Sequence, residues 1–184
     1  MVGIALLSQP LDLVVLGDAD RSFLSRLSPM PARHIPLRAD TSADRKLTAS
    51  HLDRAVLDAG RPVLLVAQGA ACLAAAWWTR LSPQSYVSRV TGALMLAPRR
   101  AGERDAMFAS PASRLPFPSI VVGADDASQQ WAVEWGSRLI DGPLPGVGPA
   151  LSNRFQSILS HFTRAIVERD IRTAERLMAA IGDH

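Results

Sequence analysis

Residues 64–73 read LLVAQGAACL, and this stretch decides the fold of the chain. It begins with an apolar run of the length and composition of a buried β-strand. The run ends at Gln68 and Gly69, where a polar residue and a glycine favour a tight turn. Alanine-rich sequence follows at once, and alanine has the highest helix propensity of any residue. The stretch therefore predicts a strand, a tight turn and a helix in direct succession.

The same apolar signature recurs along the chain, each time bounded by glycine or proline. The predicted strands are 11–17, 61–67, 91–97 and 118–123, with shorter candidates at 33–37 and 137–140. Helical patterns between them are clearest at 48–59 and 70–81. Short apolar strands that alternate with helices predict an α/β fold. We expect a doubly wound, mainly parallel sheet flanked by helices in a three-layer sandwich.

Segments rich in proline and glycine are predicted to be connections within one domain. They are 28–36, 98–118 and 142–149. From residue 153 onward apolar residues recur at three- and four-residue steps, which predicts about 28 residues of helix, either continuous or interrupted at 170–173. We expect residues 1–152 to form the α/β domain and residues 153–184 to pack on that domain or on a partner.

The composition limits the classes of function. A chain of 184 residues with 48% apolar content can bury a single core. No window approaches the roughly 18 consecutive apolar residues of a membrane span, and residues 1–9 lack the features of an export signal. The net charge of +3 comes from basic residues spread along the chain, whereas nucleic-acid surfaces show clusters. We therefore expect a cytoplasmic protein without nucleic-acid or membrane partners.

Cysteine and histidine usage argues against a disulfide framework or a metal centre. Cys72 is the single cysteine, and no two histidines lie at a ligand spacing. We expect Cys72 to pack as a small apolar residue beneath the turn, and we expect no metal and no cofactor.

Four stretches together resemble one family. They are LLVAQGAACLAAAWW from residue 64, VTGALMLAP from 90, LPFPSIVV from 115 and EWGSRLID from 134. The sequence is similar to the small single-domain serine hydrolases of the retinoblastoma-binding protein 9 type, which have an α/β-hydrolase fold. The resemblance implies a nucleophile elbow at the turn after the strand at 61–67, and a Ser-His-acid triad.

The chain departs from that triad at most of its positions. Gly69 stands where the resemblance places the serine, and Gln68 stands where the preceding histidine is usual. In the last loop, Val147 aligns with the catalytic histidine. Glycine has no side chain to act as the nucleophile, and valine cannot accept a proton. We predict a pseudoenzyme with a vestigial pocket that comprises Gly17, Asp18, Gln68, Gly69, Ala70, Asp125, Asp126 and Val147, the two later aspartates being candidates for the acid.

Three hypotheses for function remain open. The first is a non-catalytic protein that binds a protein partner or associates with itself, with Trp77, Phe162 and Ile166 as candidate contact residues. The alternative for Trp77 is packing on its own domain. The second is a sensor that holds a small anion at the helix start after Gly69. The third is a serine hydrolase with a displaced nucleophile such as Ser128 or Ser152.

Overall fold

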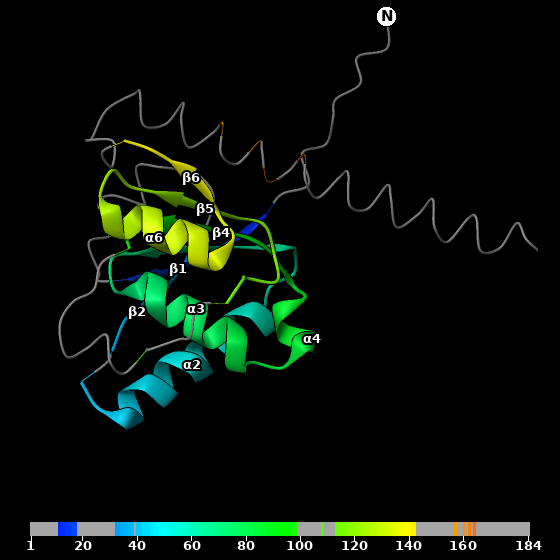
Figure 1. Cartoon of the computed structure of the whole chain (residues 1–184). Coiled ribbons are helices and arrows are strands. Elements are labelled where there is room, and N and C mark those ends of the chain that lie inside the picture. The colour runs from blue at the N-terminus through cyan, green and yellow to red at the C-terminus, as the bar shows by residue number, and fades with distance from the viewer. Residues whose placement is uncertain are drawn as a thin grey trace, which may run out of the picture.

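The computed structural model describes residues 11–17, 32–38, 40–98, 108 and 113–142, together with residues 157, 160, 162 and 164. This part of the chain forms one six-stranded sheet in the order β2-β1-β3-β4-β5-β6, and all five strand pairs are parallel (Figure 1). The strands are β1 Asp12–Gly17, β2 Ala32–Pro36, β3 Val63–Gln68, β4 Val90–Leu96, β5 Ser119–Val122 and β6 Arg138–Ile140. The helices are α2 Ser42–Leu57, α3 Ala71–Leu81, α4 Gln84–Val87 and α6 Asp126–Trp135.

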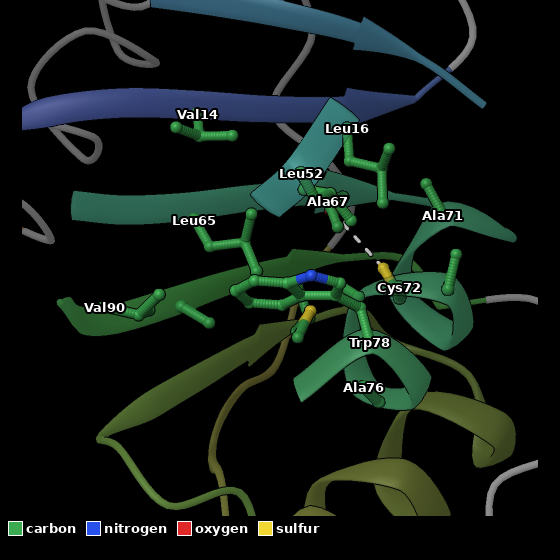
Figure 2. Close-up of a cluster of buried hydrophobic side chains, with 14 of the residues drawn as sticks. Val14, Leu16, Leu52, Leu65, Ala67, Ala71, Cys72, Ala76, Trp78 and Val90 are labelled. Carbon is green, nitrogen blue, oxygen red and sulfur yellow. Dashed lines mark hydrogen bonds between the residues drawn. The ribbon is translucent and has the colours of Figure 1, made fainter. Parts of the chain in front are cut away.

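One face of the sheet is covered by helices α2, α3 and α6. Strand side chains alternate between the two faces, and Val14, Leu65 and Ala67 point to the helical side. There they pack with Leu52 of α2 and Trp78 of α3, both of which are buried (Figure 2). This face holds the larger part of the core.

The opposite face carries a second apolar cluster. Leu64, Val66 and Leu94 point to this side and are buried. Phe162, from the C-terminal part of the chain, packs among them with 1% of its surface exposed. Gly92 makes room for it, because a Cβ added to Gly92 would lie 2.5 Å from two ring carbons of Phe162. The C-terminal part of the chain therefore contributes to the core at Phe162.

The predicted fold class is confirmed, and so are the four main strands to within a few residues. The shorter strand candidates at 33–37 and 137–140 are confirmed as β2 and β6. The loop predicted at 28–36 is therefore wrong in its second half, where β2 forms the sheet edge. Helix α2 begins at Ser42 instead of at residue 48. A capping box starts it early, since Thr41 accepts from the backbone N–H of Asp44 while Asp44 accepts from that of Thr41.

Other sequence predictions meet the structure only in part. The predicted helices did not include α4 or α6. Of the predicted C-terminal helical stretch, the four described residues are helical and the rest lies outside the described residues. Within the part of the chain that the structure describes, no helix combines the length and apolarity that a bilayer crossing requires.

Candidate functional site at the carboxyl edge of the sheet

The strand order reverses at β1, which has β2 on one side and β3 on the other. In open parallel sheets, ligands bind outside the carboxyl ends of the strands at such a reversal. Gly17 ends β1 and Gln68 ends β3. A Cβ added to Gly17 would lie 3.9 Å from the Cβ of Gln68, so the two strand ends are in contact. Two residues of the predicted pocket are thus brought together at the expected edge.

The turn after β3 has the backbone of a nucleophile elbow. Gly69 has φ of +60°, a conformation that glycine adopts readily and other residues seldom do. Its N–H donates to the carbonyl of Leu96 at 2.9 Å, and its own carbonyl accepts from the N–H of Cys72 at 3.2 Å. A Cβ built on Gly69 would have no atom of the described residues within 4 Å. The position that a nucleophile would occupy is therefore clear of the part of the chain that the structure describes.

Helix α3 begins immediately after this turn without a side-chain cap. Ala70 is its N-cap residue, no side-chain cap bond is formed among the described residues, and the first turn holds no acid. The N-terminal end of a helix carries a partial positive charge, so an uncapped start favours a negatively charged group. Ala70 is half-buried beside Gly69. This helix start is the electropositive element of the candidate site.

Cys72 lies beneath the turn, as the sequence predicted. Its thiol points back at the strand ends, with Sγ 3.4 Å from the carbonyl oxygen of Ala67 and 3.7 Å from that of Leu96 (Figure 2). Burial raises the pKa of the Cys72 thiol far above its ordinary value, because the low-dielectric core disfavours the thiolate. The thiolate is the nucleophilic form, so the buried Cys72 is inert.

The two candidate acids follow β5. Asp125 is the N-cap of α6, and its Oδ1 accepts from the N–H of Ser128 at 2.8 Å. Asp126 is the first residue of that helix, and both carboxylates are exposed. One strand, β4, separates β5 from β3, so these acids start about 10 Å from the elbow across the sheet. The capping role of Asp125 was not foreseen from the sequence.

Ser128, the displaced nucleophile considered above, is fully buried. Its hydroxyl occupies the space that a side chain at Gly123 would need, and that hydroxyl has no hydrogen-bond partner among the described residues. A serine enclosed in this way cannot reach a substrate. Ser152, Asp18, Val147 and Ile166 lie outside the described residues.

The backbone conformation at the end of β4 was not foreseen from the sequence. Ala97, directly after β4, has φ of 41°, and its N–H donates to the carbonyl of Val122 at 2.7 Å. It lies between the elbow, which bonds to Leu96, and the acid-bearing turn after β5. The residue before a proline normally adopts extended backbone, and Pro98 follows Ala97, so the local sequence predicts the opposite conformation.

Trp77 and Phe162, two of the predicted partner contacts, are both used within the domain. The Trp77 ring is half-buried, with the guanidinium carbon of Arg45 5.2 Å from its ring centroid. The ring of Phe108 meets it edge-on at a centroid distance of 5.6 Å. Phe162 is buried on the opposite face, which corrects its assignment as a partner contact. Much of the Trp77 ring therefore packs on its own domain, which was the alternative to a partner contact.

Within the described ranges, no group of three histidine, cysteine or acidic residues is close enough to hold a metal ion. The two histidines of these ranges, His34 and His51, are exposed on β2 and α2.

The parallel sheet, the strand–elbow–helix unit at Gly69 and the helix-flanked core define an α/β-hydrolase fold. The chain belongs to the serine hydrolase family, whose family model matches residues 21–147. No curated protein matches the chain.

Two solved structures illustrate the likeness of fold. One is a YdeN-like hydrolase from Pectobacterium atrosepticum, with 24% identity, a TM-score of 0.60, and coverage of 82% of this chain and 92% of that one. The other is an esterase from the fungus Rhizomucor miehei, with 10% identity, a TM-score of 0.62, and coverage of 85% and 74%.

Proposed function

We propose that this chain is a non-catalytic member of the serine hydrolase family that acts as a protein-binding or accessory subunit. The observation that carries the proposal is Gly69 at the apex of the elbow. The family chemistry begins with attack by a side-chain oxygen at this position, and glycine has none. In the sequence, Val147 aligns with the histidine that would accept the proton, so nucleophile and base are lost together.

Packing does not explain the glycine. A Cβ at residue 69 would meet no atom of the described residues within 4 Å, so these residues leave room for a serine. The positive φ favours glycine, yet the same turn carries serine in active α/β-hydrolases. Glycine at residue 69 lacks the nucleophilic oxygen, whereas the elbow keeps its backbone conformation. This combination supports a family member that binds a partner without catalysing a reaction.

No neighbouring group supplies a substitute nucleophile in the described part of the site. Burial keeps Cys72 protonated, and Ser128 is enclosed against Gly123. Asp125 caps α6. The hypothesis of a displaced nucleophile therefore receives no support from these residues.

The deciding experiment is intact-mass analysis after treatment with a broad fluorophosphonate probe, with an active family member as the positive control. We expect the control to gain one adduct and this protein to remain unmodified. A stoichiometric adduct on this protein would overturn the proposal, and peptide mapping would identify the serine responsible.

A second candidate function is the binding of a small anion at the start of α3. The absence of a side-chain cap at Ala70 and of an acid in the first turn favours it. Phosphate and acetate should then raise the melting temperature of the native protein at constant ionic strength. Ala70→Asp should abolish that rise, because its carboxylate would take the place of the anion. An equal rise in both proteins would contradict a site at Ala70.

The proposal of a protein partner keeps Trp77 and Ile166 as candidate contact residues. We also propose that the protein is cytoplasmic. The arginine-rich and lysine-poor composition, with Lys46 the single lysine, favours a bacterial source.

A further inference from the structure

Two exposed leucines lie at the C-terminal ends of neighbouring helices. Within the described part of the chain, the large apolar side chains that face solvent are Leu47, Leu57, Leu81 and Val133. Leu57 is the last residue of α2, and Leu81 is the last residue of α3. Their exposed fractions are 41% and 59%. Both helices therefore end in an apolar side chain that this chain leaves uncovered.

A hydrogen-bonded bridge holds these two helix ends together. Oδ1 of Asp53 accepts from the indole N–H of Trp78 at 2.8 Å and from the hydroxyl of Ser82 at 3.4 Å. Leu57 lies one turn beyond Asp53 on the same side of α2, because residues four apart share a helix face. Leu81 directly precedes Ser82. The two leucines are therefore neighbours across the junction between α2 and α3.

Helix α4 extends this apolar surface. Pro83, which precedes α4, is exposed, and Tyr86 within α4 is half-buried. Helix α4 also packs against α2, so it lies at the same corner of the helical layer (Figure 1). We call Leu57, Leu81, Pro83 and Tyr86 the leucine patch. Single exposed apolar side chains are ordinary, whereas a group of them from several elements marks an interaction site.

The rim of the leucine patch carries charges of both signs. Arg54 lies one turn before Leu57 or Asp58, and Asp58 directly follows Leu57. Both side chains are exposed, and Oδ2 of Asp58 lies 3.7 Å from Nε of Arg54 and 3.8 Å from Nη1 of Arg33. Exposed ion pairs at such distances contribute little within one chain. Arg54 and Asp58 can therefore pair more closely across an interface.

We propose that the leucine patch is the interface of a homodimer, in which a second copy of this chain covers it. A twofold interface must be self-complementary, because the same surface serves both copies. A twofold axis that crosses α2 between Arg54 and Asp58 would place Arg54 of each copy opposite Asp58 of the other. It would also bring the leucines of the two copies together. The assignment rests on the proposed binding function and names a second copy as the partner.

The charges of the rim favour a second copy over a partner of uniform charge. A partner surface of one sign would meet a like charge at either Arg54 or Asp58, and like charges across an interface oppose binding. The patch is small, and small interfaces form transient complexes. We therefore expect a weak dimer with a dissociation constant of about 10–100 µM.

Sedimentation velocity of the full chain from about 1 µM to about 1 mM tests the dimer. The patch variant carries Leu57→Gln with Leu81→Gln. The matched variant carries Leu47→Gln with Val133→Gln, which removes the other exposed apolar side chains of the described part. Leu47 lies about 15 Å from Leu57 along α2, and Val133 lies in α6. Glutamine is nearly as good a helix former as leucine, so both variants should fold.

A charge reversal tests the twofold arrangement separately. Arg54→Glu should weaken the dimer, because the new carboxylate would face Asp58 of the other copy. Asp58→Arg added to this variant should restore the affinity, because opposite charges would again face each other. A positive charge at residue 58 also suits the C-terminal end of α2.

We expect the native protein to pass from monomer to dimer as its concentration rises. The patch variant should raise the dissociation constant about tenfold or more, and the matched variant less than about twofold. Arg54→Glu should raise it about fivefold, and the double reversal should return it to within about twofold of the native value.

A native protein that stays monomeric at every concentration would overturn the proposal. Equal losses in the patch and matched variants, or no recovery in the double reversal, would do the same, and so would assembly beyond the dimer. A fluorophosphonate adduct would instead overturn the proposed function and leave the dimer in place, so the two failures are distinguishable.

Discussion

The backbone N–H of Gly69 donates to the carbonyl oxygen of Leu96 at 2.9 Å, which ties the apex of the elbow to the last residue of β4. The bond fixes the turn from a neighbouring strand, independently of any side chain at residue 69. The elbow geometry therefore does not depend on which side chain stands at residue 69.

A cysteine at residue 69 should react readily, while the native Cys72 should not. In Gly69→Cys, the new thiol would face open space at the start of α3, where the helix end lowers a thiol pKa. Iodoacetamide labelling with peptide mass mapping should show full modification at residue 69 and none at Cys72. Labelling of Cys72 after denaturation in guanidinium is the control. Slow labelling at residue 69 would contradict an open elbow.

The buried thiol should make stability depend on alkaline pH. Burial raises the pKa of Cys72 in the folded state, so the folded protein retains a proton that the unfolded chain loses above pH 9.0. The contribution of Cys72 to the free energy of unfolding should be complete below that pH and decrease above it. Urea titrations of the native protein and Cys72→Ala across this range measure it, and the difference between the two proteins should shrink as the pH rises. A constant difference would contradict the assignment.

Gly92→Ala should destabilise the protein through Phe162. The added Cβ would lie 2.5 Å from the ring, so the ring or the strand must move. Overpacking of this kind costs about 1–3 kcal/mol in the free energy of unfolding. Gly60→Ala is the control, because a Cβ there meets nothing within 4 Å, and it should change stability by less than about 0.5 kcal/mol. Similar effects of both substitutions would show that Phe162 does not pack on β4.

Ala97→Gly should stabilise the protein. The φ of 41° strains alanine and suits glycine, and relief of this strain outweighs the extra chain entropy of glycine by about 0.5–1 kcal/mol. Ala93→Gly in the middle of β4 should instead destabilise by about 1 kcal/mol, because no strain is relieved there. Thermal denaturation of both variants gives the comparison, and a lower melting temperature for Ala97→Gly would refute the strained conformation.

Thr41→Ala should weaken the start of α2. The substitution removes the hydrogen bond to the N–H of Asp44 and leaves one half of the capping box, which costs about 1 kcal/mol. Ser50→Ala, at an exposed position within the same helix, is the matched control and should be neutral or slightly stabilising. Chemical denaturation distinguishes them, and equal stabilities would show that the cap contributes nothing.

The sequence by itself determined the parallel sheet and the strand–turn–helix unit at residues 64–73. These features depend on local signals, because an uninterrupted apolar run specifies a strand buried on both faces and alanine specifies the helix after Gly69. The absence of a side chain at residue 69 is given directly by the sequence. The burial of Cys72 could be predicted from the same local signals.

Only the tertiary structure decided how residues distant in the sequence are used. Phe162 occupies the space beside Gly92, Asp125 caps α6, and Ala97 is held in a left-handed conformation between two strand ends. Each of these facts depends on strand order and on contacts between separate segments, and local propensity and periodicity carry no information about either.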